Sequence, residues 1–402
     1  MFLITFFFVL TLFYYRIDGR LESVNCIVPT LWLIVSILAY INPLNLYPIT
    51  IYGQLVVSLY FFAYFVGYAL LAYFVKENTV SQYRYEKVSY NYGYLATSGI
   101  IFIVLLLSIR FWSVFIDFIS LYGFAGLFNA GIQVYSNRGT DLSIGLGVLL
   151  PIDYLSIFLG IVWFRTVKNR GLFKKIVYGY MMIIPFLLAF LIQSRLNIVI
   201  MFILYLNLNY LYRVKVINFR ILLYLILCIF AISISRGIEM NSNLFGDSFF
   251  ARILAGISYY TSIGLFAFDQ FLNSTVSSSD YANYTFNGAL RLIEFFFFTD
   301  IGSVIETRVF YTPLRTITAT ALMMLWSDYN FISVAFMLFL GALNCIVLRS
   351  GRKNIFSLLI ASSLTIVMSV SFFALMTFNG GFWMFMLSGF FFSILLQYDR
   401  KN

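Results

Sequence analysis

Long apolar segments alternate with short polar ones along almost the whole chain, from Phe2 to the last few residues. About 20 apolar residues in helical conformation cross the hydrocarbon part of a bilayer, so each such segment predicts a membrane-spanning helix. About eleven spans are predicted, near 2–15, 26–42, 51–75, 93–109, 144–164, 176–192, 196–212, 221–235, 329–348, 356–376 and 382–397. The pattern therefore predicts an all-α, polytopic integral membrane protein.

The composition narrows the class further. Of 402 residues, 62% are hydrophobic and only 10% are charged. A chain of this size could not cover so much apolar surface in water, which excludes a soluble globule. The N-terminal segment has no basic residue before its apolar run and no small-residue cleavage site after it, so we expect a retained span.

Cysteine and histidine usage limits the chemistry. The three cysteines lie far apart, which predicts neither a disulfide framework nor a metal site. The chain has no histidine, so proton transfer would need a carboxylate, a tyrosine, an arginine or the substrate itself. We expect no cofactor and no metal.

Basic residues fall unevenly on the two sides of the predicted spans. Most of the 26 lysines and arginines, and every lysine, lie in polar segments that face one side if the spans alternate. The positive-inside rule makes that side cytoplasmic, which also explains the net charge of +10 without nucleic acid. The remaining basic residues are all arginines: Arg110, Arg138, Arg195, Arg236, Arg252, Arg291, Arg308 and Arg315. Because arginine binds phosphate and carboxylate oxygens two at a time, an anion site is predicted on the outer face.

The longest polar interruption divides the chain into three parts. Residues 236–328 separate the predicted spans of 1–235 from those of 329–402. A loop of this length commonly carries function, and its apolar stretches predict helices in the membrane interface or re-entering the membrane. We therefore expect 236–328 to bind substrate and to hold the catalytic residues.

Three helices are predicted inside this loop. The first, 248–272, has a broad apolar face and an opposite stripe of polar residues. The second, 285–300, carries an arginine and a glutamate three residues apart. The third is predicted to start with Thr312 as its N-cap and Pro313 in its first turn.

Arg195 raises a specific question because it lies in a short connection between two apolar runs. It can be a charge that snorkels to the interface, or a clamp for an anionic head group whose lipid tail lies in the bilayer. The other outer-face arginines favour the clamp, although each can also pair with a neighbouring carboxylate.

The chain resembles the oligosaccharide repeat-unit polymerases, which are the O-antigen polymerases of the Wzy type. The resemblance rests on ten or more spans, a large outer loop before the last three, and Ser194-Arg195 after an apolar run. It also rests on "YYTSIGLFAFDQFL", "YTFNGALRLI" and "TALMMLWSDYNFISVAFMLFLGAL". The last stretch is similar to the family's Thr-Ala-Leu and following Asp, at Thr320, Ala321, Leu322 and Asp328. It departs at Met323, where members often carry arginine, and Gln193 replaces a frequent glycine.

The resemblance implies a glycosyltransferase with GT-C-like architecture in the bacterial inner membrane. It would join repeat units carried on undecaprenyl diphosphate at the periplasmic face, with the N-terminus periplasmic and the C-terminus cytoplasmic. Its partners would be the lipid-linked glycan donor and acceptor, membrane lipid, a chain-length regulator and a flippase of the same pathway. The glycan would be O-antigen or capsular polysaccharide.

The site residues follow from this implied reaction. The leaving lipid diphosphate needs cations, which predicts a role for Arg195, Arg236, Arg252 and Arg291. The carboxylates expected to orient or deprotonate the acceptor hydroxyl are Asp247, Glu239 and Asp328. Two tyrosines expected to stack on sugars are Tyr259 and Tyr260.

Two other functions remain open. A flippase for the same lipid-linked oligosaccharide would line a cavity inside the spans with charges, whereas only Asp153 is clearly placed within a predicted span. An O-antigen ligase has a similar layout, but such enzymes generally rely on a histidine that this chain lacks.

Overall fold

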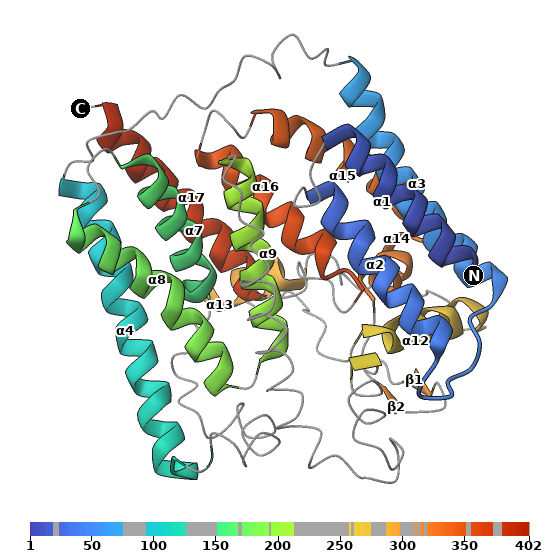
Figure 1. Ribbon diagram of the computed structural model, residues 1–402, viewed down its shortest axis with the longest axis horizontal. Coiled ribbons are helices and arrows are strands. Elements are labelled where there is room, and N and C mark those ends of the chain that lie inside the picture. Colours follow the sequence, from blue (N-terminus) through green and yellow to red (C-terminus); the bar gives the residue numbers. More distant parts are fainter. Residues whose placement is uncertain are drawn as a thin grey trace. The chain divides into compact units, whose positions relative to one another are not determined.

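The computed structural model is mostly helical (Figure 1). The residues it describes are 1–18, 24–74, 94–124, 126, 151–167, 171–192, 194–212, 257–258, 261–274, 287–297, 310–311, 315–316, 320–350, 355–372 and 380–401. The chain divides into two compact units, and each is described by itself. The first comprises Met1–Gln82, Asn243–Ser350 and Ser363–Trp383, and the second Tyr83–Ser242, Gly351–Ser362 and Met384–Asn402.

The first unit combines N-terminal helices with elements from the predicted outer loop. Its elements are α1 (Phe2–Asp18), α2 (Val24–Ile41), α3 (Ile51–Phe74), α12 (Ile263–Asn273), α13 (Asn287–Phe297), β1 (Phe310–Tyr311), β2 (Arg315–Thr316), α14 (Ala321–Tyr329) and α15 (Ile332–Ser350). The second unit contains α4 (Tyr94–Tyr122), α7 (Pro151–Thr166), α8 (Leu172–Leu191) and α9 (Arg195–Leu211). Two helices, α16 (Ile355–Ser369) and α17 (Gly380–Lys401), have residues in both units.

Four helices of the described chain are long and apolar enough to cross a membrane: α3, α4, α8 and the part of α17 at Gly381–Tyr398. Large apolar side chains point outward from them, for example Phe62, Phe102 and Phe391. In water these side chains would form costly apolar surface, whereas lipid is as apolar as they are. The helices therefore support a membrane protein.

Helices lie at the predicted spans wherever the structure describes them, and only 221–235 lies wholly outside the described residues. The largest difference is at α4, because the predicted span stopped before Arg110. The helix continues to Tyr122 and has 29 residues. It continues through Arg110 because the guanidinium is buried against the carboxylate of Asp153, which neutralises it.

In the first unit, α3 and α15 pack at a glycine crossing. A Cβ added to Gly67 would lie 1.9 Å from the carbonyl oxygen of Leu338, and one added to Gly341 would lie 1.9 Å from that of Tyr64. Only glycine permits this approach, which is the way small residues let membrane helices pack backbone to backbone. Nearby, the buried Asn344 Nδ2 donates to the Tyr64 hydroxyl at 2.6 Å.

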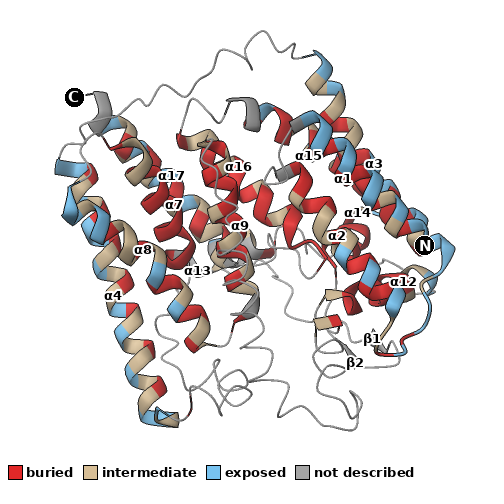
Figure 2. Ribbon diagram, viewed as in Figure 1, coloured by how far each residue is buried: buried red, intermediate tan, exposed pale blue. Residues whose placement is uncertain are grey.

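Helix α12 differs from its predicted environment. The sequence predicted an amphipathic helix with one polar stripe, but every residue from Ile263 to Asp269 is buried (Figure 2). The helix packs among α2, α3, α14 and β1, which together cover both of its faces. Of the predicted polar stripe, the described residues Ser262 and Asp269 are buried and hydrogen-bonded inside the unit: the hydroxyl of Ser262 lies 2.8 Å from that of Ser258, and Asp269 accepts from Thr50.

The third predicted loop helix begins later than expected. Helix α14 starts at Ala321, and the Thr320 hydroxyl accepts a hydrogen bond from the Met323 N–H at 3.2 Å as its N-cap. Upstream, β1 and β2 form an antiparallel pair in which Tyr311 is opposite Arg315. A helix start at Thr312 is therefore wrong. The β-branched threonines and isoleucine of this stretch favour extended backbone over helix.

The second unit is built around α7. Residues Ile152 to Trp163 of this helix are all buried, and α7 contacts α4, α8 and α9 (Figure 2). Phe385 of α17 meets the rings of Tyr154 and Phe158 edge-on, with centroids 6.3 Å and 6.2 Å apart. Helix α7 therefore packs against α4, α8 and α9 and forms the centre of this unit.

Candidate functional site

The hairpin predicted around Arg195 is formed by α8 and α9. Helix α8 ends with the N–H of Ile192 bonded to the Leu188 carbonyl oxygen at 3.0 Å. Ser194 then caps α9: its N–H donates to the Ala189 carbonyl oxygen at 2.8 Å, and its hydroxyl accepts from the Asn197 N–H at 3.4 Å. Arg195 is the first residue of α9. The short turn therefore places this arginine at the tip of two apolar helices.

Electrostatics at this tip favour an anion. The first turn of a helix carries unpaired N–H groups and a partial positive charge, so a cation there is unfavourable and an anion is favourable. Arg195, a permanently charged residue, is part of this first turn. Phosphate groups bind to such helix N-termini and to arginine by charge-assisted hydrogen bonds. The first turn of α9, which Arg195 begins, is thus suited to bind a phosphate.

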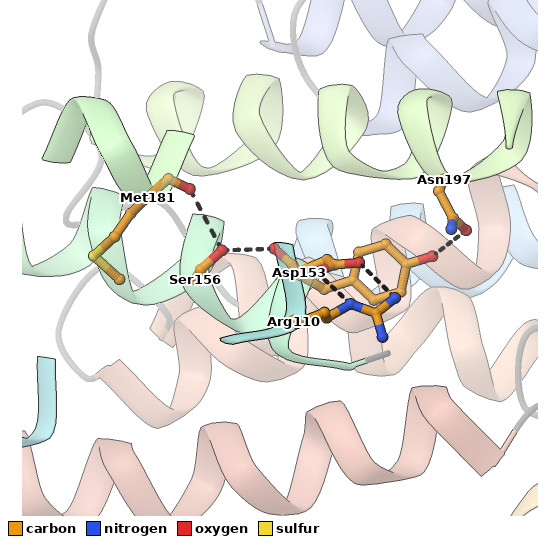
Figure 3. A network of polar contacts seen from close by, with 6 residues as sticks. Arg110, Asp153, Ser156, Met181 and Asn197 are labelled. Atoms are coloured by element: carbon orange, nitrogen blue, oxygen red, sulfur yellow. Dashed lines mark hydrogen bonds and ion pairs between the residues drawn. The ribbon is translucent and has the colours of Figure 1, made fainter. Parts of the chain in front are cut away.

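An ion pair that was not predicted lies buried in the second unit (Figure 3). Arg110 Nε lies 3.3 Å from Asp153 Oδ1, and Nη2 donates to Oδ2 at 3.3 Å. The two side chains are only 5% and 4% exposed. This arginine was counted among the outer-face arginines, but it forms an ion pair with Asp153 and donates one hydrogen bond to it. It is therefore a structural partner rather than a free anion ligand.

The first turn of α7, which carries Asp153, bonds to three other helices. The Asp153 carboxylate bonds α4 through Arg110, and Ser156 Oγ donates to the Met181 carbonyl oxygen of α8 at 3.4 Å. The hydroxyl of Tyr154 donates to Asn197 Oδ1 of α9 at 2.7 Å (Figure 3). Residues 153–156 of α7 thus link the interior of α4, the middle of α8 and the first turn of α9.

The buried carboxylate of the first unit has a different partner. Asp269 Oδ2 accepts from the Thr50 N–H at 3.0 Å, and Oδ1 accepts from the Thr50 hydroxyl. Thr50 immediately precedes α3, so the carboxylate lies at the helix N-terminus, where the dipole stabilises it. A Cβ at Gly53 would lie 2.0 Å from Asp269 Oδ1, so this contact needs glycine. Asp269 is a helix cap rather than part of an outer-face polar stripe.

Asp328 lies in the last turn of α14 and is buried. The helix ends at Asn330, which has a positive φ of 52°, and the Trp326 ring packs edge-on against Phe331 at 4.7 Å. A carboxylate at the carbonyl end of a helix opposes the dipole. The dipole of α14 therefore does not stabilise this carboxylate.

The predicted site residues have different outcomes. Arg195 begins α9 in the second unit, whereas Arg291 lies in α13 and Asp328 in α14 of the first. The motif at Thr320, Ala321 and Leu322 forms the buried start of α14. The predicted site residues that lie outside the described residues are Arg236, Glu239, Asp247, Arg252, Tyr259 and Tyr260.

The polar network around α7 was missed, although the sequence contains a signal for it. Arg110 and Asp153 are isolated charges of opposite sign inside long apolar stretches. Charges in such positions are costly in lipid unless they pair, so each indicates the other. No comparable signal marks Tyr154 or Asn197, because neutral polar residues are common in apolar helices.

Comparison with protein-family models, with curated proteins and with solved structures finds no match to this chain. Among the described residues, no group of three or more cysteine, aspartate or glutamate side chains could hold a metal ion.

Proposed function

We propose that this protein polymerises oligosaccharide repeat units carried on undecaprenyl diphosphate at the periplasmic face of the bacterial inner membrane. The observation that carries the proposal is the position of Arg195 at the first residue of α9, directly after a turn between two apolar helices. Arginine and the N–H groups of a helix N-terminus both bind phosphate, so a diphosphate whose polyprenyl chain lies in the bilayer would bind at this turn.

The proposed reaction is a glycosyl transfer. The bond between the anomeric carbon of the donor glycan and the diphosphate oxygen breaks, and the diphosphate leaves with the electron pair. An acceptor hydroxyl oxygen forms the new glycosidic bond, and its proton passes to a carboxylate or to the departing diphosphate. Arg195, with Arg236, Arg252 and Arg291, would stabilise the charge on the leaving group. The proposed proton acceptors are Asp247, Glu239 and Asp328.

The proposal includes a topology. The chain would have eleven spans, with a periplasmic loop at 236–328 between the eighth and the ninth. The N-terminus would be periplasmic and the C-terminus cytoplasmic. Helices described at ten of the predicted positions, four of them long and apolar enough to cross a membrane, support the proposal. A chain-length regulator and a flippase of the same pathway are the expected partners, and the product is O-antigen or capsular polysaccharide.

One observation favours a second candidate, a flippase for the same lipid-linked oligosaccharide. The ion pair of Arg110 and Asp153 is buried among helices α4 and α7. Intramembrane charges often mark a transport pathway. However, the two charges neutralise each other, and α7 is packed on all sides. The ion pair therefore fits a contact that holds α4 and α7 together better than the lining of a transport cavity.

The test is a strain that lacks this chain, complemented with wild type or variants, with surface polysaccharide displayed as a ladder on a gel. We expect the deletion to leave a single repeat unit on the surface lipid and the wild type to restore the ladder. Arg195→Ala should shorten or abolish the ladder because one diphosphate ligand is lost, while Arg195→Lys should recover part of it. The matched control is Arg16→Ala, which removes an exposed arginine at the end of α1.

Two results would contradict the proposal. Loss of even the single unit in the deletion strain would indicate a flippase or a ligase. A wild-type ladder with both Arg195 variants, at normal protein level, would remove Arg195 from the site.

A further inference from the structure

The tip of the α8–α9 hairpin is held by a bond from another helix. Asn197 is the third residue of α9. It makes one hydrogen bond to the capping residue of its own helix and one to α7. Its backbone N–H donates to the capping hydroxyl of Ser194, and its side-chain Oδ1 accepts from the hydroxyl of Tyr154 at 2.7 Å. The bond from Tyr154 therefore fixes the same turn of helix that begins with Arg195.

Tyr154 is fixed in turn by its neighbour in α7. The adjacent Asp153 makes a two-point contact with Arg110 of α4, both distances being 3.3 Å. A two-point contact restricts rotation as well as distance. The ring of Tyr154 is also buried and packs edge-on against Phe385 of α17. The ring of Tyr154 thus contacts α17 and its hydroxyl bonds to α9, while the ion pair of the adjacent residue holds this part of α7 against α4.

We propose that Tyr154 is a positioning residue for an anion bound at the tip of the α8–α9 hairpin, and that its hydrogen bond to Asn197 orients the turn carrying Arg195 toward a lipid diphosphate. The inference rests on the proposed function. It adds to that proposal a residue that touches no substrate and acts through α9. The ion pair of Arg110 and Asp153 holds α7 against α4 at the residue next to Tyr154.

The structure offers a matched control within the same unit. The hydroxyl of Tyr180 on α8 lies 2.8 Å from Ser108 Oγ on α4. This bond also joins a tyrosine hydroxyl to a polar side chain of another helix, but neither residue lies in α9. Changing either tyrosine to phenylalanine removes one hydroxyl and leaves the ring. A purely structural role predicts equal effects of the two changes, whereas a positioning role predicts an effect of one.

The experiment measures equilibrium binding of radiolabelled undecaprenyl diphosphate to the purified full-length protein in detergent. We expect Tyr154→Phe to weaken binding by roughly fivefold, the factor that follows from losing one ordinary hydrogen bond. Tyr180→Phe should bind as wild type does. In an Arg195→Ala background, adding Tyr154→Phe should cause no further loss, because the residue it positions is absent. Thermal unfolding of each variant is recorded to compare their stability.

The outcomes separate the two proposals. If wild type binds and Arg195→Ala weakens binding, but Tyr154→Phe matches Tyr180→Phe, the positioning role is wrong and the proposed function stands. Full additivity of Tyr154→Phe and Arg195→Ala would equally overturn it. If wild type binds no undecaprenyl diphosphate, the proposed function fails and the positioning role fails with it. Should Tyr154→Phe not accumulate, Asn197→Leu removes the acceptor of the same bond and must show the same fivefold loss.

Discussion

In the second unit a full ion pair, Arg110 with Asp153, is buried where α4 meets α7. In the first unit the buried carboxylate of Asp269 instead meets the N-terminus of α3, with Thr50 as its partner. Around the same helix α3, Asn344 joins Asn25 and Tyr64 by bonds between neutral groups. One unit thus pairs a buried charge with an opposite charge, and the other with the backbone N–H and the hydroxyl of Thr50 at a helix N-terminus.

The difference between these two buried charges predicts which substitutions each unit tolerates. An ion pair inside a low-dielectric interior is stable only while both partners remain, because either charge alone keeps its full desolvation cost. A carboxylate at a helix N-terminus depends on a fixed backbone instead. The first unit should therefore be most sensitive to changes that move α3, and the second to changes that remove one charge.

The largest effect is expected at the glycine crossing of the first unit. Gly67→Leu would place a side chain where the backbone of α15 lies, so α3 and α15 would have to separate. We expect the variant to fail to accumulate in membranes, as measured by immunoblot. Gly179→Leu on α8 is the control, because a Cβ there meets nothing within 4 Å. Normal accumulation and unfolding of Gly67→Leu would show that this crossing does not stabilise the unit.

The next effect concerns the ion pair of the second unit. Asp153→Leu leaves Arg110 buried without its counter-charge and should lower the free energy of unfolding by about 3–5 kcal/mol. The double variant Asp153→Leu with Arg110→Met should recover most of this loss, since no charge remains buried. Unfolding by titration with a denaturing detergent measures both. A double variant as unstable as Asp153→Leu would mean that the pair does more than neutralise itself.

The smallest effect is expected at the helix cap. Asp269→Asn removes the charge and turns one accepting oxygen into a donor facing Thr50, which should cost about 1–3 kcal/mol. Asp117→Asn on α4 is the matched control, because Asp117 Oδ2 is buried without a hydrogen bond in the described chain. We expect the control to be neutral or stabilising in the same titration. Equal losses for both variants would show that the cap contributes nothing specific.

Helix positions could be predicted well because they follow from a local rule. A backbone in lipid must satisfy its own hydrogen bonds, so an apolar run of sufficient length becomes a helix. The hairpin at Ser194 and Arg195 belongs to the same class of prediction, since it follows from two apolar runs joined by a short polar turn. Both are present in the structure.

Helix ends and polar partners could not be predicted in the same way. The end predicted for α4 was wrong because the partner of Arg110 lies 43 residues away along the chain. The start predicted for α14 was wrong because a threonine-proline signal at 312–313 competed with the cap that forms at Thr320. Each error arose where two local sequence signals conflicted, or where a residue far away along the chain determined the end of the helix.

The sequence by itself determined that the chain is helical and apolar, and that Arg195 lies at a turn between two helices. Only the tertiary structure decided that Arg110 pairs with Asp153, that Tyr154 holds Asn197, and that Asp269 caps α3 from a position 219 residues beyond Thr50. The physical reason is that helix formation depends on neighbours along the chain, whereas the pairing of buried polar groups depends on which helices lie side by side.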